Sequence, residues 1–258
     1  MPKRLQLQTI IKLDVMSKYL EKFFSLEGRI AIVTHAATEL GGAVIRGLAN
    51  SGAIVCGTDI SITTESQWGE NEYYIRCNLN HFPQFQLLCE EIYRQHSQLN
   101  ILLNVAEIST PGSDIQGNRL DNFRQEIESQ LQTAVHASRT AAQYILQSGG
   151  GSIINIISIK NAMGFPDDFS YIATKNALLM MTKELAVDLI KDNIRVNNIV
   201  IGYSQGLTAS EKPAQLDNHH WKDLVGTVIY LASESSDSMT GQDIFIIGDR
   251  VLSSSLQQ

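Results

Sequence analysis

The chain has 258 residues, a length at which an α/β protein commonly forms one domain with a large core. It carries 43% hydrophobic and 18% charged residues and a formal net charge of -7. This balance is typical of a soluble globular protein, and an acidic chain offers no positive field for nucleic acid. We therefore expect a small-molecule substrate and no nucleic-acid partner.

Residues 1–25 are predicted to be an amphipathic extension that precedes a folded domain of residues 26–258. The segment is basic, but Lys12 and Asp14 interrupt its apolar run, so we expect neither a signal peptide nor a membrane span, and a cytoplasmic protein. Three interpretations stay open: a helix that packs on the domain or on a partner, a helix on a membrane surface, and an upstream start assignment with the true start at Met16.

From Arg29 onward, short apolar runs rich in β-branched residues alternate with longer stretches of helical periodicity. The apolar runs predict seven strands, at residues 30–34, 53–58, 73–77, 101–105, 152–158, 194–201 and 243–247. Helices are expected between them, near residues 40–51, 83–96, 119–147, 169–191 and 220–233. The alternation predicts an α/β fold with one Rossmann-like, doubly wound parallel sheet of about seven strands, flanked by helices.

Three cysteines, Cys56, Cys77 and Cys89, lie within or beside these apolar segments, and no two of them form a C-x-x-C pair. A disulfide framework and a zinc site are therefore not expected, and we predict reduced, buried thiols and no metal site.

Asp59 directly follows the second predicted strand. In dinucleotide-binding folds a carboxylate at this place accepts hydrogen bonds from the adenosine ribose hydroxyls and repels a 2′-phosphate. The position favours NAD(H) over NADP as cofactor. A simple turn or N-cap aspartate is the other interpretation.

The fifth predicted strand ends at Ser158, and Tyr171 and Lys175 lie one turn apart in the helix expected next. The pKa of an unperturbed tyrosine hydroxyl is about 10, as in model peptides. An adjacent ammonium favours the phenolate form of the tyrosine. A serine hydroxyl beside it can orient a carbonyl or alkoxide oxygen for proton transfer. The three residues therefore predict an acid/base site, although a tyrosine and a lysine at this spacing are also common as a surface pair.

Several separated segments occur here in one order: LEGRIAIVT, GAIVCGTDI, GSIINIISI, YIATK, NIRVNNI and MTGQDIFIIG. With them, the chain from about Leu26 to Leu252 resembles the classical short-chain dehydrogenases/reductases. The resemblance implies a seven-stranded Rossmann-like sheet and catalytic roles for Ser158, Tyr171 and Lys175, with the lysine also at the nicotinamide ribose. It places the family's catalytic asparagine at Gln130.

The phosphate turn of that family, T-G-x-x-x-G-x-G, corresponds here to the stretch from Thr34 to Gly41, in which His35 and Glu39 replace two glycines. We expect His35 to strain the turn. Glu39 either repels the pyrophosphate or points into solvent. The family's N-N-A-G reads N-V-A-E here and ends in Glu107, a second carboxylate near the cofactor. The resemblance assigns cofactor-binding positions to Thr34, Leu40, Gly41, Asp59, Ile60, Asn78, Leu79, Asn104, Ala106, Tyr171 and Lys175.

These observations favour an NAD(P)-dependent oxidoreductase that acts on a secondary alcohol or carbonyl. The altered phosphate turn keeps two alternatives open: a lyase, dehydratase or cyclase on the same scaffold, and a catalytically silent binding or assembly partner. The resemblance also implies a homodimer or homotetramer. Ala134, Ala137, Leu178 and Met181 are candidates for its interface, with burial in the core as the other explanation.

Overall fold

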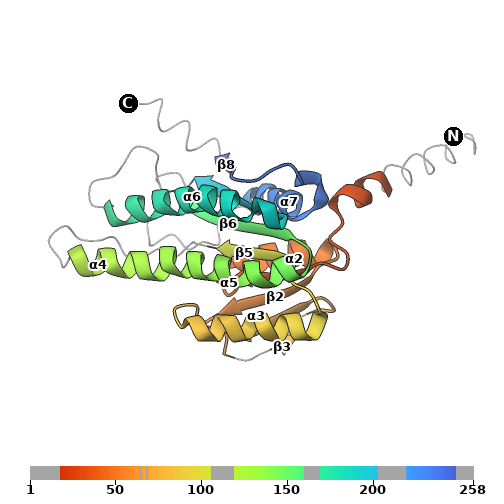
Figure 1. Ribbon diagram of the computed structural model, residues 1–258, viewed down its shortest axis with the longest axis horizontal. Coiled ribbons are helices and arrows are strands. Elements are labelled where there is room, and N and C mark those ends of the chain that lie inside the picture. The colour runs from red at the N-terminus through yellow and green to blue at the C-terminus, as the bar shows by residue number, and fades with distance from the viewer. Residues whose placement is uncertain are drawn as a thin grey trace, which may run out of the picture.

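The computed structural model describes residues 18–63, 66–67, 69–105, 119–159, 169–202 and 219–247. A twisted sheet forms the centre of this part of the chain, with helices on both faces (Figure 1). The strands run in the spatial order β3-β4-β2-β1-β5-β6-β7-β8. Their bounds are β1 Ile30–Thr34, β2 Ile54–Asp59, β3 Ser66–Gln67, β4 Glu72–Arg76, β5 Ile101–Val105, β6 Gly151–Ile159, β7 Ile194–Gly202 and β8 Asp243–Ile247.

Seven of these strands pair in parallel, as the sequence predicts. The eighth, β3, is a two-residue strand that pairs antiparallel with β4 at the sheet edge, and it is an addition to the prediction. The order reverses direction at β1, with β2 on one side and β5 on the other. In doubly wound sheets, ligands bind beyond the carboxyl ends of the strands at this reversal.

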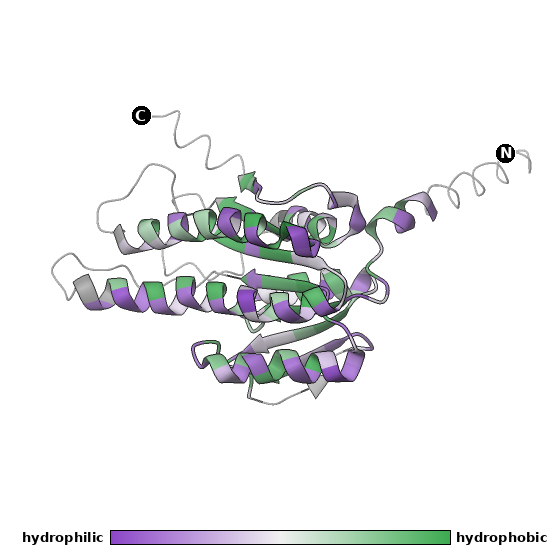
Figure 2. Ribbon diagram, viewed as in Figure 1, coloured by the Kyte–Doolittle hydropathy of each residue, from purple (hydrophilic) through white to green (hydrophobic). Residues whose placement is uncertain are grey.

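Helices cover the sheet at the positions expected from the apolar periodicity. Their bounds are α2 Glu39–Asn50, α3 Phe82–His96, α4 Arg119–Glu126, α5 Thr133–Gln147, α6 Phe169–Leu189 and α7 His219–Ala232. Helices α2 and α7 pack on one face, where Val44 and Leu224 join a buried cluster. Helices α3, α5 and α6 pack on the other face, through residues such as Phe85 and Leu185. Figure 2 shows the result as helices that carry both hydrophobic and hydrophilic residues.

The long helix expected over residues 119–147 is interrupted. A π-helical turn, η1 (Ile127–Gln132), separates α4 from α5. The hydroxyl of Thr133, directly after this turn, lies within hydrogen-bond distance of two acceptors, Asn80 Oδ1 at 2.9 Å and the carbonyl oxygen of Glu128 at 3.1 Å. π-Helical turns are rare, and they occur frequently at functional sites.

Three of the four residues suggested for an oligomer interface are core residues. Ala134 and Leu178 pack with Ile157 in a buried cluster, and Ala137, on α5, is buried in the cluster that includes the apolar residues of α3. Met181 is half-buried against the same clusters. Of the two explanations given for these residues, burial in the core is therefore the one that holds for Ala134, Ala137 and Leu178, because α5 packs against both α3 and α6.

Residues 18–24 form a helical segment ahead of the sheet, and the carbonyl oxygen of Phe23 accepts a hydrogen bond from Ser235 Oγ at 2.7 Å. The remainder of the predicted N-terminal extension lies outside the described residues. In the described part of the chain, no helix has both the length and the apolar character needed to cross a membrane.

Candidate active site

The structure brings Ser158, Tyr171 and Lys175 together beyond the carboxyl end of β6. Ser158 is the second-last residue of β6, and the other two lie on the first turns of α6. The Tyr171 hydroxyl donates to the Ser158 carbonyl oxygen at 2.5 Å and lies 3.3 Å from the Ser158 Oγ. The Lys175 ammonium lies 5.1 Å from the centre of the Tyr171 ring. The trio predicted from spacing therefore forms one cluster.

Lys175 is a buried ammonium that reaches away from solvent toward η1. Its side chain is 2% exposed, and its Nζ donates to Gln130 Oε1 at 2.6 Å. Gln130 Nε2 in turn donates to Glu126 Oε2 at 2.8 Å. Gln130 thus occupies the place next to the lysine that the resemblance gives it, and a buried carboxylate stands behind it.

The phosphate turn keeps a left-handed residue at the position of the first glycine. His35 has φ 51°, a conformation that suits glycine and that costs other residues about 1–2 kcal/mol. A Cβ on Gly41 would lie 2.6 Å from the His35 carbonyl oxygen, so the backbone packs too closely there for any larger residue. The strain expected at His35 is confirmed as a left-handed backbone. Glu39 is exposed, which agrees with the interpretation in which it points into solvent.

Asp59 ends β2 beside the phosphate turn and is 8% exposed. Its Oδ1 accepts hydrogen bonds from the Ser61 backbone N–H at 2.9 Å and the Ser61 hydroxyl at 2.8 Å. Its Oδ2 accepts a longer bond from the Ala37 N–H at 3.4 Å. The carboxylate therefore caps its own turn, and it also fixes β2 against the phosphate turn.

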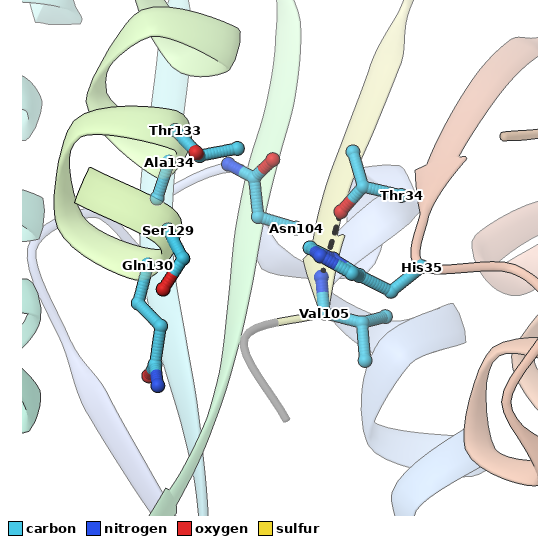
Figure 3. A pocket seen from close by; sticks show the side chains of 8 residues that line it. All are labelled: Thr34, His35, Asn104, Val105, Ser129, Gln130, Thr133 and Ala134. Carbon is cyan, nitrogen blue, oxygen red and sulfur yellow. Dashed lines mark hydrogen bonds between the residues drawn. The ribbon is translucent and has the colours of Figure 1, made fainter. Parts of the chain in front are cut away.

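A pocket lies between the phosphate turn and the helical layer that holds Gln130 (Figure 3). Four of its lining residues come from the ends of β1 and β5 or directly follow them, and four come from η1 and the start of α5. Two buried polar atoms that line it, Nδ1 of His35 and Oγ of Ser129, have no hydrogen-bond partner among the residues that the structure describes.

Burial lowers the pKa of His35 below its ordinary value, the nearby Asp59 and the backbone of Val105 oppose this shift, and Lys175 adds to it. The imidazole is therefore neutral at neutral pH. Asp59 at the end of β2 and Lys175 on α6 thus both act electrostatically on this imidazole.

The remaining predicted cofactor residues have diverse surroundings. Thr34 is buried, and its Oγ1 accepts a bond from the Val105 N–H at 3.1 Å. Asn104 donates to Ser138 Oγ at 3.0 Å and to Asn155 Oδ1 at 2.9 Å, so its amide links strands and helix.

The other predicted positions lie in the core or at the surface. Leu40 and Leu79 point into the core, and Ile60 is exposed. The side-chain oxygen of Asn78 accepts from the Asn80 N–H at 3.1 Å. The predicted positions Ala106 and Glu107 lie outside the described residues.

Sequence reasoning missed Glu126 and Ser129. A carboxylate four residues before Gln130 lies on the same face of a helix as that glutamine, so a signal for Glu126 was present. It was indistinguishable from an ordinary surface pair, since the burial of that face could not be read from the periodicity. Ser129 carried no comparable signal.

Comparisons with known proteins identify the family of the chain. A family model described as short chain dehydrogenase matches residues 29–218. The chain is 29% identical over 244 residues to a 2-dehydro-3-deoxy-D-gluconate 5-dehydrogenase of Escherichia coli (strain K12), covering 87% of this chain and 96% of the relative. It is 25% identical over 246 residues to a 3-oxoacyl-(acyl-carrier-protein) reductase of Thermotoga maritima, covering 88% and 99%.

Solved structures show the same fold. A short-chain dehydrogenase/reductase from Serratia marcescens superposes with a TM-score of 0.72 at 27% identity, over 86% of this chain and 97% of that one. A gluconate 5-dehydrogenase from Burkholderia cenocepacia, solved in complex with NADP and tartrate, gives a TM-score of 0.74 at 22% identity, over 89% and 97%. Because the family model matches most of the sheet and its helices, the chain belongs to the short-chain dehydrogenase family, a family of oxidoreductases.

Proposed function

We propose that this protein is an NAD(H)-dependent dehydrogenase or reductase that interconverts a secondary alcohol and a carbonyl compound. The observation that carries the proposal is the buried cluster in which the Tyr171 hydroxyl lies 3.3 Å from Ser158 Oγ while Lys175 lies beside the Tyr171 ring. Three residues with complementary acid/base tasks meet at the place where doubly wound sheets bind ligands.

In this proposal each side chain of the cluster has one task. Tyr171 gives its hydroxyl proton to the carbonyl oxygen during reduction and takes it back during alcohol oxidation. Ser158 donates a hydrogen bond to the same oxygen and orients it toward the tyrosine. Lys175 stabilises the phenolate through its charge. The burial of the cluster excludes water and strengthens these interactions.

The residues of the phosphate turn fit a dinucleotide. The left-handed backbone at His35, the close packing at Gly41 and the N-terminus of α2 retain the shape of an anion-binding turn. Asp59 stands where ribose hydroxyls are bound, and its charge supports NAD(H) over NADP(H). When bound, the dinucleotide supplies the hydride that the side chains cannot.

The substrate class that we propose first is a hydroxylated or keto sugar acid. Several relatives of the chain, among them those from Escherichia coli and Bacillus subtilis, are named 2-dehydro-3-deoxy-D-gluconate 5-dehydrogenases. The 3-oxoacyl reductase relative makes a β-keto thioester the second class to examine. We also propose a cytoplasmic location, which suits the three free, buried cysteines of the chain.

The test of the proposed function combines binding with activity. We expect NADH to bind the purified protein and quench or shift its fluorescence, and we expect oxidation of NADH with a panel of keto acids and keto thioesters. Tyr171→Phe keeps the aromatic ring, so it should still bind NADH, and it should lose at least about a hundredfold in kcat, the range of one acid/base catalyst. Absence of NADH and NADPH binding at millimolar concentration would reject the proposal and favour a non-redox enzyme or a binding protein.

A further inference from the structure

The buried Lys175 ammonium needs a counter-charge inside the protein. Its side chain is 2% exposed, and a charge removed from water persists only when it is paired and hydrogen-bonded. The proposed reaction places a phenolate at Tyr171 during part of the cycle, but in the resting site that hydroxyl is protonated and donates to the Ser158 carbonyl oxygen. A different group has to balance the lysine in this state.

Glu126 is in a position to do so. It is 5% exposed, it lies one turn before Gln130, and its Oε2 accepts from Gln130 Nε2 at 2.8 Å. The same amide uses its Oε1 to accept from Lys175 Nζ at 2.6 Å. The carboxylate and the ammonium therefore fix which way the amide is turned, because the oxygen faces the cation and the NH₂ group faces the anion.

We propose that Glu126 is a positioning residue of this active site: its buried carboxylate, acting through Gln130, holds Lys175 in place and sets the pH at which the Tyr171–Lys175 pair releases its protons. The effect of Glu126 on catalysis rests on the proposed function. The charge coupling itself exists in the protein without substrate or cofactor.

The sign of the coupling follows from Coulomb's law. A carboxylate near an ammonium and a phenol favours the protonated form of both, so its removal lets both groups lose their protons at lower pH. Tyr171 faces Lys175 from its own helix, Glu126 from α4 and His35 from the loop after β1, with Asp59 acting on His35 from β2. Of these groups, Glu126 belongs to the hydrogen-bonded chain that ends on the Lys175 ammonium.

The experiment replaces the charge and keeps the hydrogen bond. In Glu126→Gln the new amide oxygen still accepts from Gln130, so the geometry is preserved while the charge is lost. Tyr171 ionisation is followed by the ultraviolet absorbance of tyrosinate, as the difference between each variant and the same variant with Tyr171→Phe. We expect the titration to move down by on the order of half a pH unit or more. The pH profile of kcat should move in the same direction.

Two further variants separate charge from structure. Glu128→Gln removes an exposed carboxylate two residues away, and it should leave the titration in place. The swap Glu126→Gln with Gln130→Glu returns a carboxylate to direct contact with Lys175. It should restore the original midpoint or raise it further.

The outcomes are distinct. A shifted titration that the swap reverses supports the inference, even if the protein oxidises no alcohol and reduces no carbonyl. An unshifted titration in a folded Glu126→Gln protein overturns it, whatever the activity. If Glu126→Gln does not fold, the swap decides: a folded swap with an unchanged or raised midpoint supports the coupling, and a folded swap with a lowered midpoint refutes it.

Discussion

At the scale of single residues, His35 holds a position that the phosphate turn normally gives to glycine. The backbone remains left-handed there, so the chain accommodates the side chain and keeps the turn. The imidazole lines the pocket beside Ser129 and Asn104 (Figure 3). A residue that titrates near neutral pH in water is thereby placed where burial lowers its pKa.

The burial of His35 predicts acid sensitivity. Its pKa in the folded protein is lowered, so the unfolded chain binds the proton first and folding stability falls as the pH drops below the unfolded value of 6.5. Urea unfolding measures the free energy of unfolding at about pH 7 and about pH 5. As the pH falls between these values, the native protein should lose more of this free energy than His35→Asn, by on the order of 1 kcal/mol. Asparagine tolerates the left-handed backbone, which makes it a suitable control. Equal losses in both proteins would contradict the prediction.

Asp59 predicts the choice between the two nicotinamide cofactors. In Asp59→Ser the repulsion of a 2′-phosphate is removed, so the ratio of the Kd for NADPH to the Kd for NADH should fall by about tenfold or more. Fluorescence titration of both cofactors measures this ratio. Ser61→Ala is the control, because it removes a donor to Asp59 and keeps the carboxylate. If the native protein already prefers NADPH, the assignment of Asp59 fails.

The site residues that lie at short, regular spacings along the chain could be predicted from the sequence. Tyr171 and Lys175 share a helix, and Ser158 ends the strand before it, so their meeting follows from the order of elements. Glu126 and Ser129 reach the site through η1, and their place depends on which face of a helix is buried. That information resides in tertiary packing, which local periodicity does not contain.

At the scale of elements, a chain of buried polar side chains crosses the sheet from β5 to β8. Asn104 donates to Asn155, which donates to the hydroxyl of Thr182 at 2.8 Å. Thr182 donates to Asn198 at 2.6 Å, and Asn198 donates to Asp243 at 2.6 Å. Each side chain satisfies its neighbour, so the chain fixes the mutual position of four strands and α6.

Thr182 is the link whose loss leaves two partners unsatisfied. Thr182→Val preserves the shape of the side chain but removes the acceptor for Asn155 and the donor to Asn198, so we expect a loss of about 2–3 kcal/mol in the free energy of unfolding. Thr227→Val in α7 removes a hydroxyl that bonds only within its own helix in the described contacts, and it should change stability by less than about 0.5 kcal/mol. Chemical denaturation of both variants provides the comparison.

The elements themselves follow closely from the apolar pattern. The central strands β1, β2 and β5 are near-continuous apolar runs because both of their faces are covered, and such runs are visible in the sequence. The two-residue β3 has no run to reveal it, since it is held only by pairing with β4. The turn η1 is hidden for a related reason: α4 and α5 have helical periodicity on both sides of it, and a single shifted turn changes the pattern too little.

At the scale of the whole molecule, α6 carries an apolar stripe that the sheet does not cover. Met180 and Val187 lie two helical turns apart and are 56% and 74% exposed, and Ile190 follows at 60%. Aligned apolar side chains of this exposure are typical of an interface between subunits. The homo-oligomer that the resemblance implies therefore has a candidate surface, different from the residues first suggested.

We expect light scattering after size-exclusion chromatography to show a dimer or tetramer at micromolar concentration. Val187→Glu should convert it to smaller species, because a charge would be buried at the interface. Leu87→Glu alters an equally exposed leucine on α3, at 63%, and should leave the assembly intact. If the native protein is a monomer, the predicted interface does not exist. If Leu87→Glu dissociates the assembly and Val187→Glu does not, the interface lies elsewhere than on α6.

The π-helical turn also bears on how such a site arises. A π turn holds one residue more than an α turn, so η1 is equivalent to a single-codon insertion between two ordinary helices. If that residue were deleted, α4 would rotate by about 100° about its axis relative to α5, and Glu126 would leave the face that Gln130 presents to Lys175. The placement of Glu126 thus depends on one residue of the π turn, whose two flanking helices keep their regular geometry. Lineages that lack the insertion would be expected to have an apolar residue at the corresponding place.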